Sequence, residues 1–517
     1  MTISKTQMEI SNTKIKQLAE MIPTTNVYDV AEVSALTLAK RLSSRYGNQL
    51  WLKREDQQSV FSFKLRGAYN KISNLSEEQL QAGVIAASAG NHAQGVALAA
   101  QRLKIKAQIV MPTTTPRIKV ESVRAMGAAV VLYGDNYDEA CGHALELAAK
   151  STQTFIHPYD DMAVMAGQGT VAKEILEQFK SPIDAVFIPV GGGGLIAGMS
   201  AWLRTHAPET KIIGVEPEDA ATLHAAMAAQ ERVVLEQVGI FADGVAVKQI
   251  GQNTFDVARE TVDEVILVST DDMCAAIHDI FDDTRVLSEP AGALAVAGMK
   301  KYIVRENCKN QNLVAVNSGA NVNFDRLRHV VERSEIGEGR EGLFAVTIPE
   351  EKGSFLRFCS IIGKCSISEF NYRYSTASEA HIFLGVKFEQ AQKEKIAMIE
   401  KLQLNGYAVV DISDNEMAKL HLRHLVGGHS PELEEEFLVR FEFPERPGAL
   451  LQFLEGMGAR WNISLFHYRN HGSAYGRVLV GAQVAEQDRD EFRAFLDGLG
   501  YRYHEESENP AYPLFLR

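Results

Sequence analysis

Lys64 lies in an apolar and aromatic run, SVFSFKLRGAYNKI, between Phe63 and Leu65. A lysine in such surroundings can lay its aliphatic stem on apolar surface and keep its ammonium in water, which is the ordinary arrangement. If the ammonium is instead held in a desolvated pocket, its pKa falls and the amine becomes a nucleophile and a base. Lys64 is therefore a candidate catalytic residue, with a solvated surface lysine as the alternative.

The segment PVGGGGLIAG contains four consecutive glycines, Gly191, Gly192, Gly193 and Gly194, followed by Leu195. Without Cβ atoms, consecutive backbone N–H groups can approach an anion, and a helix starting near Leu195 adds the positive end of its dipole. The run lacks the Lys-Ser or Lys-Thr of a Walker A loop and the register of the dinucleotide fingerprint. It favours a phosphate site for a cofactor smaller than a nucleotide, with a linker or packing turn as the alternative.

Two further polar turns contain candidate ligands. SAGNHAQG offers Asn91, whose amide can donate and accept hydrogen bonds, and NSGAN offers the hydroxyl of Ser318. Asn91 is also explained as a helix N-cap, and His92 as a structural or exposed residue. With Lys64 and the glycine run, these groups match the needs of pyridoxal phosphate: a Schiff-base amine, a phosphate loop, and partners for the ring oxygen and ring nitrogen.

The elements that must position these residues follow an alternating pattern. Short apolar runs indicate buried parallel strands, with Ala-rich helical stretches between them, which predicts a doubly wound α/β fold. The expected strands are 84–89, 107–112, 128–134, 184–190, 211–217 and 312–318. Three of them, 84–89, 184–190 and 312–318, end in the turns described above. Ligands gather beyond the carboxyl ends of parallel strands, so we expect these turns to face one crevice.

Composition narrows the class of protein. The chain has 517 residues, 46% hydrophobic and 23% charged, as expected of a soluble multidomain enzyme. A formal net charge of -13 without clustered Lys and Arg argues against a nucleic-acid partner. Five scattered cysteines indicate free thiols in a reducing compartment and no metal site. The N-terminus lacks a signal-peptide core, and no stretch reaches the roughly 20 apolar residues of a membrane span, so we expect a cytoplasmic protein without a membrane partner.

The last third contains an internal repeat, in which residues 344–388 match residues 437–484 and Gly353 aligns with Gly448. Each copy has the pattern of a strand, a glycine turn, a helix and two strands, with another helix and strand to follow. The two helix starts could hold an effector carboxylate, or the glycines could merely permit left-handed turns. The pattern predicts two copies of a small α+β module.

The motifs SFKLRGA, SAGNHAQG, PVGGGGLIAG, SEPAGA and NSGAN, in this order, resemble the threonine dehydratase family of fold-type II pyridoxal-phosphate enzymes, over roughly residues 20–330. The resemblance implies a tryptophan synthase beta-like catalytic fold with pyridoxal 5'-phosphate as the cofactor. It implies these roles: Lys64 forms the Schiff base, Asn91 contacts the ring oxygen, Gly191, Gly192, Gly193, Gly194 and Leu195 hold the phosphate, and Ser318 contacts the ring nitrogen. Glu289 in SEPAGA also belongs to a family motif, and it either lies near the ring or caps a helix.

The repeated modules resemble ACT-like regulatory domains, and RHLVGG at 423–428 resembles the biosynthetic members of the family. This implies that L-threonine is dehydrated and deaminated to 2-oxobutanoate and ammonia, the first step of L-isoleucine biosynthesis. It also implies feedback inhibition by isoleucine, relief by valine, and a homotetramer. The expected boundaries are a catalytic domain at 1–330 with a smaller lobe inserted at roughly 56–160, a linker at 331–342, ACT-like domains at 343–414 and 435–510, and a connector at 415–434.

The sequence leaves two alternative functions open. A serine-preferring dehydratase, or an enzyme with L-serine as a secondary substrate, is possible because no residue shows whether the pocket admits the threonine methyl group. The chain could instead be an amino-acid-sensing protein built on an inactive enzyme fold. The intact Lys64 argues against this second alternative, because an inert scaffold has no need of a Schiff-base lysine.

Overall fold

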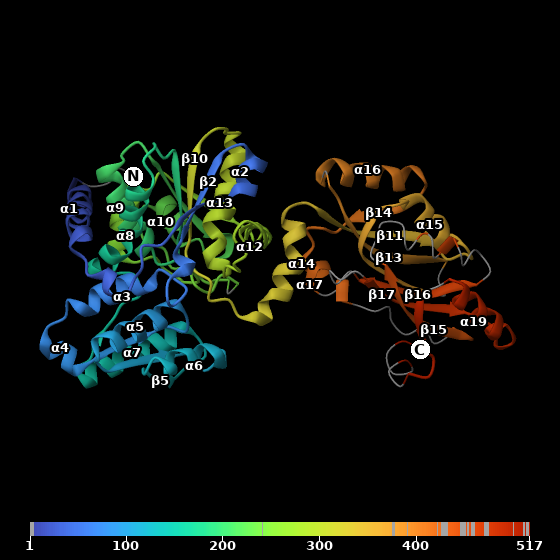
Figure 1. The fold of residues 1–517 in the computed structure, drawn as a ribbon, viewed down its shortest axis with the longest axis horizontal. Coiled ribbons are helices and arrows are strands. Elements are labelled where there is room, and N and C mark those ends of the chain that lie inside the picture. Colours follow the sequence, from blue (N-terminus) through green and yellow to red (C-terminus); the bar gives the residue numbers. More distant parts are fainter. Residues whose placement is uncertain are drawn as a thin grey trace. The chain divides into compact units, whose positions relative to one another are not determined.

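The computed structural model describes residues 5–239, 241–374, 378–389, 391–420, 422–424, 433–444, 451, 454–455, 461–469, 475–499, 501–509, 512 and 516. The chain divides into two compact units, Met1–Ser334 and Glu335–Arg517 (Figure 1). The expected linker, 331–342, contains the end of α14 (Leu327–Gly337) and the start of β11 (Glu341–Pro349). Within the described ranges, no helix combines the length and apolar character needed to span a bilayer.

A six-stranded sheet in the order β1-β2-β10-β7-β8-β9 forms the centre of the first unit. Its strands are β1 (Leu36–Leu38), β2 (Gln49–Arg54), β7 (Ala185–Pro189), β8 (Lys211–Pro217), β9 (Glu264–Val268) and β10 (Asn312–Asn317). All neighbours are parallel except β1 and β2. β7 is buried at every residue, as its continuous apolar run predicts for a strand covered on both faces.

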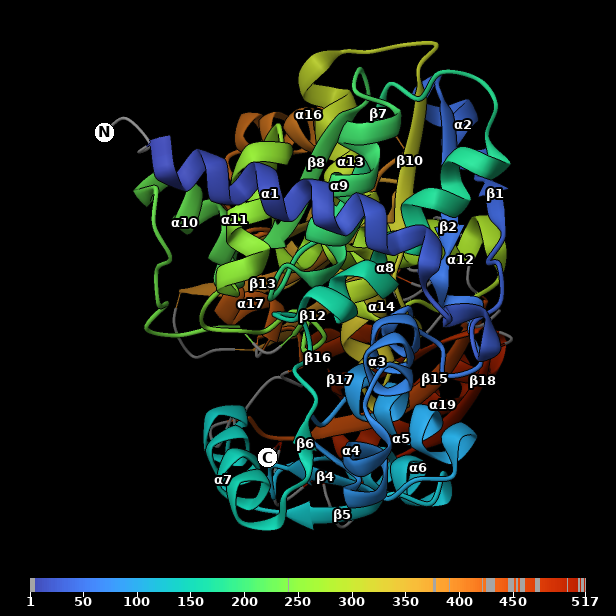
Figure 2. The ribbon, with the colours of Figure 1, turned by 90° about the vertical axis from the view of Figure 1, so that its left-hand side faces the viewer.

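Helices pack on both faces of this sheet, through two separate apolar clusters. One face is covered by α2 (Lys40–Tyr46), α12 (Thr270–Thr284) and α13 (Pro290–Glu306), and the other by α8 (Met162–Gln178), α9 (Gly194–His206), α10 (Thr222–Ala229) and α11 (Gln252–Thr261). Helix α1 (Lys5–Met21) lies across α8 and α9 (Figure 2). The doubly wound prediction is confirmed for this sheet.

A second, four-stranded parallel sheet in the order β5-β4-β3-β6 lies in the same unit. Its strands are β3 (Val84–Ala87), β4 (Ala107–Met111), β5 (Ala129–Leu132) and β6 (Thr154–Phe155), and its helices are α3 (Lys64–Ser73), α4 (Glu77–Ala82), α5 (Asn91–Leu103), α6 (Arg117–Ala125) and α7 (Tyr137–Ser151). All six expected strands form, three in each sheet. The polar turn after β3 therefore comes from a different sheet than the turns after β7 and β10.

The second unit is built on one antiparallel sheet of eight strands in the order β14-β11-β13-β12-β16-β17-β15-β18. The first copy supplies β11, β12 (Ser366–Arg373), β13 (Glu379–Lys387), β14 (Ala408–Asp411), α15 (Ser354–Ile362) and α16 (Ala391–Leu404), and the second supplies β15 (Glu436–Pro444), β16 (Asn462–Arg469), β17 (Tyr475–Gln483), β18 (Arg502–Glu505) and α19 (Arg489–Gly498). Pairing of β12 with β16 joins the copies. The short α17 (Glu416–Leu420) follows the first copy.

Both copies carry an irregularity at the same place. The register of β12 against β13 shifts between Ile367 and Glu369, and that of β16 against β17 shifts between Ile463 and Leu465. A bulge is a built feature of a strand, so its recurrence supports the internal repeat. Gly353 precedes α15 with a left-handed φ of +85°, whereas Gly448 lies outside the described residues. Most of RHLVGG, residues 425–428, also lies outside them.

Candidate active site

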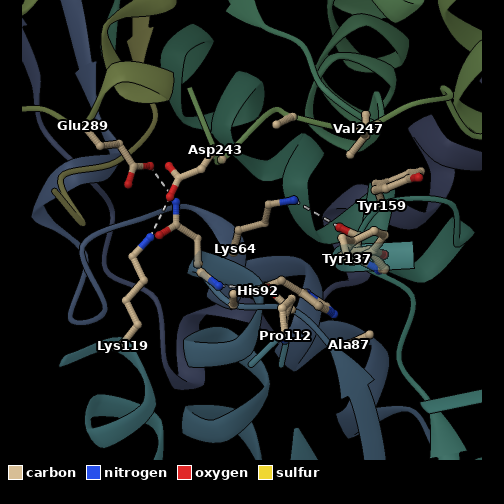
Figure 3. A pocket seen from close by; sticks show the side chains of 18 residues that line it. Lys64, Ala87, His92, Pro112, Lys119, Tyr137, Tyr159, Asp243, Val247 and Glu289 are labelled. Atoms are coloured by element: carbon tan, nitrogen blue, oxygen red, sulfur yellow. Dashed lines mark hydrogen bonds and ion pairs between the residues drawn. The ribbon is translucent and has the colours of Figure 1, made fainter. Parts of the chain in front are cut away.

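All residues predicted for the site line one pocket in the first unit: Lys64, Asn91, Gly191, Gly192, Gly193, Gly194, Leu195 and Ser318. They come from the starts of α3 and α5, the turn between β7 and α9, and the end of β10. An adjoining pocket of about 180 Å³ shares Lys64, Asn91 and Gly192 with it (Figure 3). The three turns thus face one crevice, even though two sheets supply them.

Lys64 is the first residue of α3. Its Nζ donates a hydrogen bond to the backbone oxygen of Pro158 at 3.2 Å and points into the pocket (Figure 3). Burial lowers the pKa of the ammonium to about 8, and the carboxylate of Glu289 opposes this shift. The structure therefore favours the desolvated amine over a solvated surface lysine.

The glycine turn combines close packing with free backbone donors. Helix α9 begins at Gly194, and Gly193 before it has a left-handed φ of +90°. A Cβ at Gly192 would overlap the ring of Tyr159, and one at Gly191 would lie 2.8 Å from the Cα of Val245. Within the described ranges, the backbone N–H groups from Gly191 to Leu195 donate to no other group of the chain. The turn can therefore offer several donors to an anion at a helix start.

Asn91 is the first residue of α5, and Gly90 occupies the N-cap position, so the N-cap interpretation of Asn91 is wrong. Its Nδ2 donates to Oε1 of Glu289 at 2.6 Å, and its Oδ1 accepts from Nδ2 of Asn321 at 2.7 Å. Glu289 does precede α13 as its N-cap residue, but its side chain makes no capping bond. Glu289 instead orients the amide of Asn91 at the pocket wall.

Burial raises the pKa of Glu289 to about 7, and the charge of Asp243 adds to this shift. The hydrogen bond from Asn91 and the ammonium of Lys119 act in the opposite direction. A carboxyl with this pKa is protonated in part near neutral pH. The charge of the pocket wall therefore depends on pH.

Ser318 follows β10 and is buried. Its hydroxyl donates to the backbone oxygen of Ala291 at 3.3 Å, which is long for an O–H donor. The hydroxyl can therefore turn toward another acceptor in the pocket.

His92 has a structural role. Its Nε2 lies 3.0 Å from the backbone oxygen of Ile156, and burial lowers the pKa of the imidazole to about 3.

Comparisons with known proteins agree with this geometry. Residues 29–319 match the family "Pyridoxal-phosphate dependent enzyme", and residues 332–422 and 427–516 each match "C-terminal regulatory domain of Threonine dehydratase". The chain is 53% identical over 498 residues to L-threonine dehydratase biosynthetic IlvA of Burkholderia multivorans. The matched region covers 96% of this chain and 98% of the relative. It is 52% identical to the Escherichia coli protein of the same name, over 95% of each chain. The chain belongs to the biosynthetic threonine dehydratases.

Solved structures resemble the dehydratase chain over its catalytic portion. The processed form of threonine deaminase isoform 2 from Solanum lycopersicum is 53% identical, with a TM-score of 0.61, covering 62% of this chain and 94% of that one. Maize serine racemase is 29% identical, with a TM-score of 0.56, covering 62% and 96%. The fold-type II catalytic fold and the two C-terminal regulatory domains expected from the sequence are therefore confirmed.

Pyridoxal phosphate is the cofactor of this family, and the residues present in the dehydratase fit it. The free N–H groups of the glycine turn suit its phosphate, and the low-pKa amine of Lys64 suits its aldehyde. Ser318 lines the same pocket, and a hydroxyl is a suitable donor for a ring nitrogen.

Several residues of the dehydratase pocket were not predicted from the sequence. They are Lys119, Tyr137, Pro158, Tyr159, Asp243 and Val247. Asp243 and Val247 lie in a segment without helix or strand, and no motif distinguishes them. Tyr159 follows β6, which has two residues and is too short to produce a pattern. The HPYDD run after β6 is the signal that could have identified Tyr159.

Proposed function

We propose that this chain is a pyridoxal-phosphate-dependent threonine ammonia-lyase that converts L-threonine to 2-oxobutanoate and ammonia, the first step of isoleucine biosynthesis. One observation carries the proposal: the amine of Lys64, the glycine turn and Ser318 line the same pocket. The relatives named threonine dehydratase match nearly the whole chain, which supports the choice of substrate.

Each predicted site residue has a proposed role. Lys64 would hold the cofactor covalently, Gly191, Gly192, Gly193, Gly194 and Leu195 would bind its phosphate, Asn91 would donate to its ring oxygen, and Ser318 would donate to its ring nitrogen. When bound, pyridoxal phosphate supplies an electron sink for the electrons of the substrate Cα–H bond. Glu289 is a positioning residue, because it acts through its hydrogen bond to Asn91.

The chain supplies the base for the reaction. Once the substrate amine has displaced Lys64 from the cofactor, the freed Lys64 amine can take the proton from the substrate Cα, because burial holds its pKa at about 8 and leaves it substantially neutral at mildly alkaline pH. An ammonium cannot accept this proton, so kcat should rise as the pH increases through about 8. Tyr159 packs against the glycine turn and forms part of the pocket wall on that side.

The test combines spectra with turnover. Purified protein should show the visible absorbance of the bound cofactor and release 2-oxobutanoate from L-threonine, and Lys64→Ala should lose both. Comparing kcat/KM for L-threonine and L-serine decides between a threonine enzyme and a serine-preferring one. An absorbance band that survives Lys64→Ala would contradict the role of Lys64. A wild-type protein without band or turnover would favour the amino-acid-sensing alternative.

We propose that isoleucine inhibits the enzyme through the C-terminal domains and that valine relieves the inhibition. Two matches to the regulatory family support this, and the left-handed Gly353 at the start of α15 offers a site for an effector carboxylate. Adding isoleucine to the turnover assay, with and without valine, tests it. Resemblance to the family is the basis for proposing a cytoplasmic homotetramer.

The domain boundaries proposed are a catalytic domain at 1–330 with its smaller lobe at roughly 56–160, a linker at 331–342, ACT-like domains at 343–414 and 435–510, and a connector at 415–434. The division of the chain between Ser334 and Glu335 supports the first of these boundaries. Limited proteolysis followed by mass spectrometry of the fragments tests them.

A further inference from the structure

Residues 243–248, named the strap here, lie along one side of the pocket without forming a helix or strand. The strap residues that line the pocket are Asp243, Gly244, Ala246 and Val247. Figure 3 shows Asp243 and Val247 on one side of Lys64, with Lys119 and Pro112 on the other. The strap therefore faces the helices of the four-stranded sheet across the pocket.

Both ends of the strap form ion pairs across this gap. At one end, Oδ2 of Asp243 lies 2.7 Å from Nζ of Lys119, in α6. At the other end, Nζ of Lys248 lies 2.9 Å from Oδ2 of Asp138, in α7. The two pairs have opposite polarity, with the acid on the strap at one end and the base on the strap at the other. The strap is thus tied at both ends to the part of the unit that carries the four-stranded sheet.

The two pairs differ in strength. Lys248 and Asp138 are 46% and 56% exposed, so water and salt screen their attraction. Lys119 and Asp243 are 16% and 33% exposed and are screened less. The Lys248 end should therefore open more readily than the Asp243 end.

Asp243 has a second cation on the other side. Oδ1 of Asp243 lies 3.5 Å from Nη1 of Arg326, which also donates to the backbone oxygen of Phe241 at 2.8 Å. If Lys119 moves away, Asp243 therefore keeps a cationic neighbour and is not left as an uncompensated charge. Because Asp243 has a cation on both sides, separating it from Lys119 costs less than breaking an isolated pair.

We propose that the strap is a gate over the pocket, and that opening of the Lys248–Asp138 and Lys119–Asp243 ion pairs admits the substrate and releases the product. The identity of the substrate and product depends on the proposed function. The evidence for the gate is independent of that function and consists of the two ion pairs and the residues that line the pocket. The middle of the strap suits this role, since Gly244 and Ala246 carry little side chain. Val245 anchors the strap from behind by packing against Gly191.

The experiment reverses charge at the exposed end, where folding should tolerate it. Lys248→Glu places a carboxylate opposite Asp138, and the exchanged double variant Lys248→Glu with Asp138→Lys restores attraction. Backbone hydrogen exchange of peptides covering 241–248 in the full-length protein should rise about fivefold in the single variant. It should return to near the wild-type rate in the double variant. Lys173→Glu is the matched control, because it reverses a partly exposed pair with Glu177 on α8.

Turnover gives the second readout. The gate predicts that Lys248→Glu changes KM for L-threonine more than the double variant does, and that about 0.5 M salt raises strap exchange in the wild type but not in Lys248→Glu. Unchanged strap exchange in Lys248→Glu, or a rise that the double variant fails to reverse, overturns the gate. If exchange follows the prediction and no 2-oxobutanoate forms, the gate stands and the proposed function fails. If turnover is normal and exchange is insensitive to charge, only the gate fails.

Discussion

Arg66 lies two residues after Lys64, in α3, and is fully buried. Its guanidinium donates to both carboxylate oxygens of Glu55 at 2.8 Å, and to those of Glu174 at 2.6 and 3.1 Å. Nζ of Lys53 also lies 2.6 Å from Glu174, and none of these four side chains is exposed. Two cations and two anions therefore balance each other in the interior, next to the candidate base.

Replacing Arg66 with methionine would leave this cluster with a net negative charge. Removing one partner of a buried ion pair costs roughly 3–5 kcal/mol, and here one guanidinium serves two carboxylates. We therefore expect the free energy of unfolding of the first unit to fall by about 4 kcal/mol or more. The lost hydrogen bonds to Thr170 and to the backbone oxygen of Glu32 add to this loss.

The effect should depend on pH. Burial acts to raise the pKa of Glu174, but Arg66 and Lys53 outweigh it and hold this pKa below its usual range. Without Arg66, burial should win and the folded-state pKa should rise. A carboxyl with a raised folded pKa contributes stability below its unfolded pKa of about 4.3, and loses it as the pH rises through the folded value. Arg66→Met should therefore be less destabilising at about pH 5 than at pH 8.

Urea denaturation in a Trp461→Phe background measures this loss. Trp51 and Trp202 then remain as the tryptophans, so their fluorescence reports on the first unit. Adding Glu55→Gln to Arg66→Met leaves Lys53 with Glu174 and should recover part of the loss. A Lys173→Met control, which removes a partly exposed pair with Glu177, should cost less than about 1 kcal/mol. An equal loss at both pH values, with no recovery from Glu55→Gln, would refute the electrostatic reasoning.

Two further predictions concern the pocket. Gly192→Ala adds a methyl group that overlaps the ring of Tyr159, so the affinity for pyridoxal phosphate should fall about tenfold or more, as measured by titration of the cofactor-free protein. Gly142→Ala in α7, where a Cβ meets open space, should leave that affinity unchanged, and equal losses in both would contradict the packing argument. Because the pKa of Glu289 is raised to about 7, its carboxyl stabilises the cofactor-free protein at acid pH and loses this contribution as the pH rises through 7. Gln mimics the protonated carboxyl, so urea midpoints of wild type and Glu289→Gln should agree most closely near pH 5, and wild type should lose stability relative to the variant toward pH 8; a constant difference would contradict the raised pKa.

The strands that the sequence revealed are those with continuous runs of apolar residues, such as β3 and β7, which are buried at every residue. β2 was not predicted, because Lys53 and Arg54 at its end resemble a solvated segment. Both are buried: Lys53 pairs with Glu174, and Arg54 pairs with Asp56 at 2.7 Å. The partner of Lys53 lies more than 100 positions away, and no local pattern reports such a contact.

The site residues also divide into those that a local sequence pattern predicts and those that depend on long-range contacts. The glycine turn was predictable because the backbone requirement is local, and Lys64 because its neighbours are apolar. The contact between Asn91 and Glu289 was not predictable, since it joins the first residue of α5 to the residue before α13, and these helices pack beside different sheets. Asp243 was missed because it lies in a segment without helix or strand, where the side chain carries no periodic signal.

Because β12 pairs with β16, each regulatory copy occupies a strand edge of the other copy that would otherwise be unpaired. A chain shortened after the first copy would expose the hydrogen-bonding edge of β12, together with Phe370, which packs against Phe466 of the second copy with ring centroids 5.6 Å apart. An open edge of that kind is a template for pairing with another chain. The outer strands, β14 and β18, have four residues each and offer much shorter edges. Duplication thus protects this sheet against aggregation, and shortened forms of the chain should self-associate through β12.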